Sequence, residues 1–291
     1  MSLYEFLERP DLESPVLVLA LEGWIDAGGA AAMAATAVLD TAETTTLVRF
    51  DADELLDHRS RRPIVHIDGG LNTGLTWPAI ELVALSDPQG SDVLVLRGSE
   101  PDHRWRAFAR AVVDLALELG VGLVVGLGAY PAPAPHTRRS RLASTATDRL
   151  LADRVGSLRT TVDVPGGINA AIEERCAAVG LPAVTIWAQV PHYASGMAYP
   201  GAALALVEKL NELGSFSFPT GELAAEAAAT RSRLDTLVAE SAEHVELLRQ
   251  LERNADQSET EPGPGPADAE GLPSGDELAG EIERFLREQG G

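Results

Sequence analysis

The stretch PVLVLALEGWIDAGGAAAMAATAVL, residues 15–39, decides the fold. It begins with an unbroken apolar run, residues 16–21, which is typical of a strand buried on both faces. A turn that contains three glycines, residues 22–29, then leads into an alanine-rich helix. A buried strand followed at once by a helix predicts the first β–α crossover of an α/β domain. Open α/β sheets place their sites at the carboxyl ends of such strands.

The same alternation continues along the chain. Further buried strands are predicted over residues 92–97, 121–127 and 183–190. Helices are predicted over residues 103–119, 148–155, 170–179 and 201–213, and shorter strands over 44–50, 63–67, 75–77, 80–85 and 160–164. The runs between residues 63 and 85 are separated by turn residues and indicate an antiparallel hairpin or meander. We therefore expect one α/β core, residues 1–215, with a mostly parallel sheet and an antiparallel portion.

The last part of the chain differs from this core. Residues 216–255 predict one long helix that packs on the core or on a neighbouring subunit, with an apolar stripe formed by Leu234, Leu237, Val238, Val245, Leu248 and Leu251. Residues 256–273 are acidic and rich in Pro and Gly, so they predict a disordered linker. Residues 274–291 begin with a capping box and predict a short amphipathic docking helix. Its partner-docking face is formed by Leu278, Ile282, Phe285 and Leu286.

Composition excludes several classes of function. The chain has 23 Lys and Arg against 44 Asp and Glu, and the formal charge of −21 argues against nucleic acid and anionic membranes as partners. No apolar run approaches the length of a membrane span, and the first residues lack a signal-peptide pattern. Cys176 is the single cysteine, which excludes an internal disulfide. These features predict a cytoplasmic protein.

The motifs of common enzymes are absent from the sequence. It contains no G-x-G-x-x-G dinucleotide fingerprint, no P-loop and no G-x-S-x-G nucleophile elbow. Lys209, the only lysine, falls within a predicted helix, where it is badly placed to clamp a phosphate. No histidine pair has a local metal-ligand spacing. We therefore expect no cofactor and no metal site.

Polar residues follow three of the buried strands and form the candidate site. The ligand-binding candidates are Glu22, Asp26 and Gly28 after the first strand, His136 and Arg138 after residues 121–127, and His192 and Tyr193 after residues 183–190. If these strands are parallel neighbours, their carboxyl ends meet at one edge, and the side chains surround one concave surface. Each residue also has a structural interpretation, for example Asp26 as the cap of the turn.

Three segments of the sequence resemble a known family. EGWIDAGGAA (residues 22–31), VPGGINAAIEERCAAVGLPAV (164–184) and WAQVPHYASGMAYPGAA (187–203) are similar to the actinobacterial branch of the PAC2 family, which is named for a proteasome-assembly chaperone. The resemblance covers residues 1–250. It implies a three-layer α/β/α sandwich of phosphorylase-like architecture and a homo-oligomer, with a trimer preferred. Archaeal relatives are linked to proteasome assembly, but the family supplies no catalytic residues to carry over.

Two functional hypotheses follow. The first is a non-enzymatic, oligomeric assembly factor or binding scaffold with proteasome-related or other protein partners. It is favoured by the resemblance and by the missing nucleophile and phosphate motifs. The second is a small-molecule-binding protein or an enzyme that acts on a nucleoside-like or phosphorylated ligand at the carboxyl ends of the strands. A phosphorylase-like fold does not by itself imply phosphorylase activity, because function belongs to the site.

Overall fold

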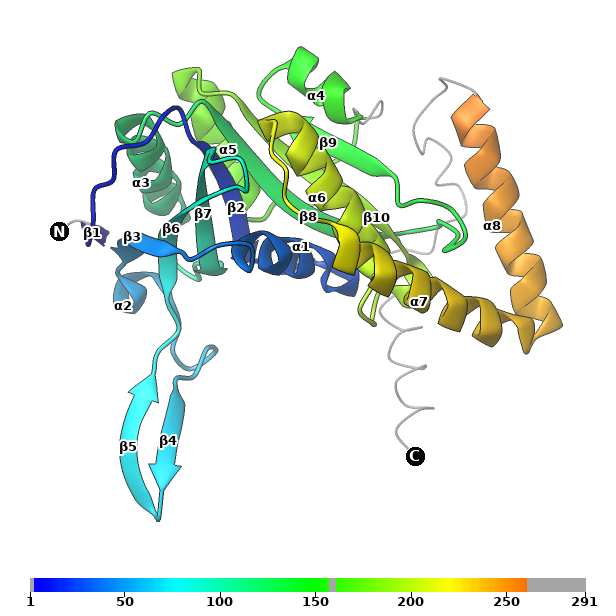
Figure 1. Ribbon diagram of the computed structural model, residues 1–291, viewed down its shortest axis with the longest axis horizontal. Helices are drawn as coiled ribbons and strands as arrows, with labels where there is room; N and C mark the ends of the chain where they lie inside the picture. Colours follow the sequence, from blue (N-terminus) through cyan, green and yellow to red (C-terminus); the bar gives the residue numbers. More distant parts are fainter. Residues whose placement is uncertain (1–2, 157–160, 261–291) are drawn as a thin grey trace.

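The computed structural model describes residues 3–156 and 161–260, and a mixed eight-stranded sheet runs through its centre (Figure 1). The strand order is β1 (Tyr4–Phe6), β3 (Thr45–Phe50), β6 (Ile80–Ser86), β7 (Asp92–Ser99), β2 (Val16–Glu22), β8 (Leu123–Ala132), β10 (Ala183–Pro191) and β9 (Leu142–Ala146). The central strands β7, β2, β8 and β10 are parallel, whereas β9 and the β6–β3–β1 side pair antiparallel. The predicted α/β class, with its parallel core and antiparallel portion, is confirmed.

Helices cover both faces of the sheet, which gives the three layers that the resemblance implied. Helices α1 (Ala30–Leu39) and α6 (Pro200–Gly214) pack on one face, and α3 (Trp105–Glu118) and α5 (Ile168–Val179) pack on the other (Figure 1). Side chains of a strand alternate between faces. In β7, Val93 and Val95 therefore enter the α1–α6 core, while Leu94 and Leu96 enter the α3–α5 core.

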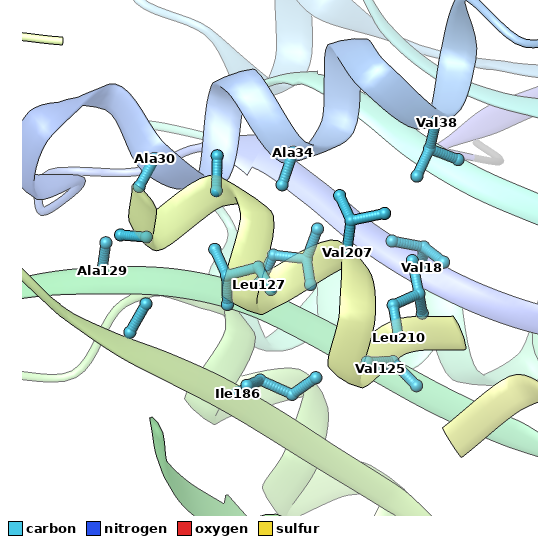
Figure 2. Close-up of a cluster of buried hydrophobic side chains, with 14 of the residues drawn as sticks. Val18, Ala30, Ala34, Val38, Val125, Leu127, Ala129, Ile186, Val207 and Leu210 are labelled. Carbon is cyan, nitrogen blue, oxygen red and sulfur yellow. The ribbon is translucent and has the colours of Figure 1, made fainter. Parts of the chain in front are cut away.

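The alanines of α1 allow that helix to lie close to its neighbours. Figure 2 shows Ala30, Ala34 and Val38 of α1 pointing into the same cluster as Val207 and Leu210 of α6. All five side chains are buried. A helix face built from alanine brings its backbone near the sheet with little side-chain entropy to lose. Residues 15–39 thus form both the central strand β2 and the helix α1, which shares one outer layer with α6.

Several local predictions need correction. Residues 161–164, expected in a strand over 160–164, are exposed and irregular, and Thr160 lies outside the described residues. Strand β9 was not expected, because its sequence LASTA has little β-branched or aromatic character. It forms because it pairs with the edge of β10. The helix expected over residues 148–155 is present as α4 (Arg149–Val155), capped by the Asp148 side chain.

The long C-terminal helix is in fact two helices. α7 (Gly221–Ala239) ends before Ser241, whose backbone carbonyl and side chain accept hydrogen bonds from the first turn of α8 (Ala242–Thr260). Ser is a favoured N-cap residue, so this serine starts a new helix where hydrophobic periodicity alone predicted continuation. Residues 256–260 belong to α8 and not to a linker. The rest of the predicted linker and the helix expected within 274–291 lie outside the described residues.

One hairpin stands apart from the sandwich. β4 (Ile64–Asp68) and β5 (Leu71–Thr76) form their own two-stranded antiparallel sheet, which projects away from the body in Figure 1. We call residues 64–77 the arm. The remaining short elements are α2 (Ala52–Leu55), η1 (Ala27–Gly29) and η2 (His192–Ala194). None of the helices in the described ranges is both long enough and apolar enough to cross a membrane.

Candidate functional site

The carboxyl ends of β2, β8 and β10 lie side by side, and we call this edge of the sheet the rim. The three strands are parallel neighbours in that order. Asp26 also forms an isolated parallel bridge with Ala129 of β8, which ties the turn after β2 to the neighbouring strand. The three polar segments predicted from the sequence therefore leave the sheet at the same edge.

Asp26 acts as the cap of α1. Its Oδ1 accepts the N–H of Ala31 at 2.8 Å, and its Oδ2 accepts the N–H of Ala32 at 3.0 Å. A carboxylate at a helix N-terminus satisfies backbone donors that have no partner in the helix, and it complements the positive end of the helix dipole. The structural interpretation of Asp26 is confirmed. A role in ligand binding would have to share these two oxygens.

Gly28 joins the turn after β2 to the segment after β10. Its N–H donates to Ser195 O at 2.8 Å, and its carbonyl accepts the N–H of Tyr199 at 2.9 Å. The residue has a φ of 64°, and a Cβ placed there would lie 2.6 Å from Tyr199 Cβ. Only glycine tolerates both the left-handed backbone and this close approach. Both backbone polar groups of Gly28 are therefore used within the protein.

His136 is the centre of a hydrogen-bonded chain of three side chains. It is 3% exposed; its Nδ1 lies 2.7 Å from the Tyr193 hydroxyl, and its Nε2 lies 3.2 Å from Asp235 Oδ1 on α7. A carboxylate only accepts, so Nε2 carries the proton and Nδ1 accepts from the hydroxyl. The backbone N–H of His136 also donates to that hydroxyl at 2.8 Å. The chain connects the loop after β8 with η2 and α7.

Burial shifts the pKa values of His136 and Tyr193 in the directions that favour their neutral forms. Burial lowers the pKa of His136 below its usual range, against the opposing influence of the Asp235 carboxylate. Burial likewise raises the pKa of Tyr193. A phenol activated as a base or nucleophile would need the opposite direction. The arrangement therefore positions α7 and gives Tyr193 no special reactivity.

Arg138 attaches α8 to the same loop. Its Nε and Nη2 bind the two carboxylate oxygens of Asp256 at 2.8 and 2.9 Å, and its Nη1 lies 3.2 Å from Glu252. The neighbouring Thr137 hydroxyl donates to the same Glu252 oxygen at 2.5 Å. The hydrogen bond to Asp256, with the Asp256 and Glu252 charges, raises the pKa of Arg138 above its already high value. We call residues 133–141 the clamp loop, since they hold both α7 and α8.

Glu22 and His192 remain at the surface. His192 packs edge-on against Tyr193, with ring centroids 5.3 Å apart. The backbone carbonyl of Glu22 accepts the N–H of Glu100, on the β7 side of the rim. Within residues 3–156 and 161–260, no hydrogen bond or ion pair joins the Glu22 side chain to His136 or His192. The predicted common concave surface stays a prediction.

Some residues that shape the rim carried no recognisable sequence signal. Asp235, Glu252 and Asp256 are ordinary acidic residues of C-terminal helices, and only the fold places them on the clamp loop. Glu100 is buried and accepts the N–H of Ile168 at 2.6 Å, where it caps α5. Its position after a buried strand, in the run GSEP, was the available signal. Trp24 beside it is 60% exposed.

Two hollows of the structure lie away from the rim. One void of about 10 Å³ lies among apolar side chains under α3, including Leu17, Phe50 and Leu115. A second, open hollow of about 420 Å³ lies at the opposite end of β2 and is lined by residues that include Glu13, Asp92 and Phe216. Among the residues that the structure describes, no group of three His, Cys, Asp or Glu side chains is placed to hold a metal ion.

These features define a three-layer α/β/α protein with two clamped C-terminal helices and a projecting arm. The chain belongs to the PAC2 family, whose model matches residues 20–238, from β2 to the last turn of α7. This confirms the resemblance seen in the sequence. Among curated proteins, none matches the chain.

Solved structures extend the likeness beyond the family model. A protein of unknown function from Mycobacterium tuberculosis is 37% identical, with a TM-score of 0.80, over 89% of this chain and 90% of the other. A proteasome-assembly chaperone homologue from the same organism is 33% identical, with a TM-score of 0.74, over 80% and 99%. A PAC2 family protein from Streptomyces avermitilis is 37% identical, with a TM-score of 0.71, over 80% and 99%.

Proposed function

We propose that this protein is a non-enzymatic assembly factor of the cytoplasm, a homo-oligomer that binds proteasome-related protein partners. The observation that carries the proposal is the 33% identity, across almost the whole of the other chain, to a proteasome-assembly chaperone homologue. As the sequence resemblance implied, we favour a trimer.

The rim supports a scaffold role. The hydrogen-bonding groups of four rim residues already bind other parts of the protein. Asp26 and Gly28 hold α1 and the segment after η2, and His136 and Arg138 hold α7 and α8. Burial also raises the pKa of the Cys176 thiol to about 11, so this thiol is not activated as a nucleophile. Hydrogen bonds within the protein hold the rim and its helices in one arrangement. A surface with one fixed arrangement suits the recognition of another protein.

The C-terminal segment supplies a candidate docking element. Leu278, Ile282, Phe285 and Leu286 have the i, i+4, i+7, i+8 spacing of one helix face. A helix of this length is marginal in water without a groove to bury that face. We propose that residues 274–291 bind a hydrophobic groove of the partner.

Affinity purification tests this proposal. The tagged full-length chain is incubated with purified proteasome core particle and its free subunits, and bound proteins are identified by mass spectrometry. We expect capture of proteasome subunits, and loss of that capture for the chain truncated after Thr260. The double variant Leu278→Asp with Phe285→Asp keeps the full length of the chain but removes the apolar face of residues 274–291. It should therefore lose the capture as well. Failure of the full-length protein to bind any proteasome component contradicts the proposal.

A small-molecule role at the rim is the second candidate. The observation that favours it is the exposure of Glu22, Trp24 and His192, which places acidic, aromatic and imidazole groups at one edge of the sheet. A nucleoside-like or phosphorylated ligand bound there would raise the melting temperature by mass action. A thermal-shift screen with nucleosides and nucleotides tests this. A shift that is abolished by Trp24→Ala and His192→Ala would favour this candidate over the scaffold.

A further inference from the structure

The arm exposes more large apolar side chains than any other stretch of similar length in the described part of the chain. Among the described residues, sixteen large hydrophobic side chains are exposed, and six of them belong to the arm. These six are Ile64, Val65, Ile67, Leu71, Leu75 and Trp77. Ile67 and Leu71, near the tip, are 67% and 72% exposed. Contiguous apolar surface of this kind marks an interaction site.

The arm receives little support from its own chain. Ile64 and Val65 are consecutive strand residues, so they point to opposite faces of the hairpin, and both are exposed. At its base, Trp77 packs edge-on against His58 with ring centroids 5.1 Å apart. A two-stranded hairpin by itself is at best marginally stable in water. The arm therefore needs a partner on its faces.

The arm and its base carry a net positive charge within a strongly acidic chain. Residues 58–77 contain three arginines, at positions 59, 61 and 62, and one acidic residue, Asp68. Arg61 pairs with Asp102, but Arg59 and Arg62 are exposed. The segment thus carries a formal charge of +2 in a chain whose formal charge is −21. Its partner should be apolar and acidic.

Two helices of this same chain, α7 and α8, have both properties. Helices α7 and α8 expose Leu237 (56%) and Leu247 (44%) and leave Val238 and Val245 only partly buried. Residues 221–260 hold nine acidic and four basic side chains, a formal charge of −5. In the apolar stripe predicted for this region, Leu234 and Leu251 are buried within the chain, whereas Leu237 is exposed.

The two surfaces cannot meet within one molecule. In Figure 1 the arm projects from one end of the long axis, and α7 and α8 lie at the other. Contact between them requires two copies, with the arm of one against the helices of the next. Such a head-to-tail contact uses a different surface on each side, and it closes into a ring when the rotation permits.

We propose that the arm of one copy docks on the α7–α8 surface of a second copy of this chain. The inference rests on the homo-oligomer of the proposed function and names its interface. Apolar side chains at the arm tip bury Leu237 and Leu247 of the neighbour. The positively charged residues at the foot of the arm, Arg59 and Arg62, face the acidic helices. Opposite charges on the two surfaces favour this pairing over arm to arm.

Light scattering coupled to size exclusion, on the full chain at micromolar concentration, tests the proposal. The arm variant is Ile67→Asp with Leu71→Asp, and the helix variant is Leu237→Asp with Leu247→Asp. All four side chains are exposed in the single chain, so both variants should keep the wild-type circular dichroism. Leu150→Asp, at an 80% exposed position of α4 outside both surfaces, is the matched control. We expect the wild type and the control to be oligomers, and each double variant to be a 30.7 kDa monomer.

Mixing the two double variants is the decisive measurement. Each retains one intact surface, so a head-to-tail contact predicts recovery of a one-to-one dimer and no larger species. In each double variant alone, the dissociation constant should rise at least about 30-fold, as for loss of interface hot spots. An oligomeric helix variant would indicate arm-to-arm contact and overturn the inference, as would an oligomeric arm variant; both leave the proposed homo-oligomer intact. A monomeric wild type overturns both.

Discussion

The clamp loop and the arm of this protein differ in their secondary structure and in how many contacts their side chains make with the rest of the chain. The clamp loop has no regular secondary structure over most of its length, yet His136 and Arg138 bind side chains of three other elements. The arm is a regular hairpin, yet its apolar side chains lie in solvent. Tertiary contacts, and not hydrogen-bonded strands, decide which region is stable on its own. The clamp loop finds its partners within one chain, whereas the apolar side chains of the arm remain exposed there.

Substitution of Gly28 should produce the largest loss of stability. In Gly28→Ala, the new Cβ meets Tyr199 Cβ at 2.6 Å, and the left-handed backbone adds strain. Overpacking and strain together predict a loss of about 3–5 kcal/mol in the free energy of unfolding, measured by urea denaturation.

The arm offers a matched control for this clash. Gly69 in the hairpin turn also has a positive φ, 55°, but a Cβ there meets nothing within 4 Å. Gly69→Ala should therefore cost only the backbone strain, about 1 kcal/mol. Equal losses at the two glycines would show that backbone strain alone, without crowding, explains Gly28.

Removal of the buried histidine should have the next largest effect. His136→Ala removes the acceptor of the Tyr193 O–H and the imidazole donor to Asp235 and opens a cavity, while the backbone N–H of residue 136 still donates to the Tyr193 hydroxyl. We expect a loss of about 2–4 kcal/mol in the free energy of unfolding. His192→Ala, an exposed histidine against the same tyrosine, should change it by less than about 0.5 kcal/mol. Similar losses for both would contradict the chain of hydrogen bonds.

The same histidine predicts a dependence of stability on pH. Burial lowers the pKa of His136 in the folded protein, so the unfolded chain takes up a proton first as the pH falls. The stabilisation by neutral His136 is complete above the unfolded pKa of about 6.5, and it is lost as the pH falls below that value. Denaturation series at pH 7.5 and pH 5.5 should show a smaller pH-dependent loss for His136→Ala than for the wild type. Equal losses would mean that groups other than His136 determine the pH dependence of stability in this range.

Attachment of α8 should depend on Arg138 without a large effect on the core. Arg138→Met removes the ion pairs that Arg138 forms with Asp256 and Glu252, while Leu251 of α8 stays buried. Hydrogen exchange of amides in α8 should become faster, and exchange in β8 should be unchanged. Arg139→Met, which removes the neighbouring pair with Glu208 of α6, is the control. Unchanged exchange in α8 would show that the ion pairs do not hold the helix.

The sequence could predict the sandwich because its signals are local. Unbroken apolar runs gave β2, β7, β8 and β10, and 3.6-residue periodicity gave α3 and α6. Strand β9 was not predicted, because its small and polar residues form a strand only where the edge of β10 is available for pairing. The break at Ser241 escaped because an apolar stripe continued across it.

The connections of the candidate site could not be predicted in the same way. His136 and Asp235 are 99 positions apart, and Arg138 and Asp256 are 118 positions apart. No periodicity or spacing rule relates such residues, because their contact depends on how α6 and α7 pack. The strand exits could be located from the sequence, but the partners that occupy their polar groups could not.

The smallest effect on the single chain should come from the arm. Ile67→Asp places a charge where an apolar side chain is 67% exposed, so no buried contact is lost. At nanomolar concentration, where self-association is weak, the free energy of unfolding should change by less than about 0.5 kcal/mol. The same substitution at Ile186, which is fully buried in β10, should prevent folding. At micromolar concentration the melting temperature of Ile67→Asp should fall below that of the wild type, because a bound second copy stabilises the folded state by mass action. Equal melting temperatures at both concentrations would show that the arm gains no partner and is stable in solvent.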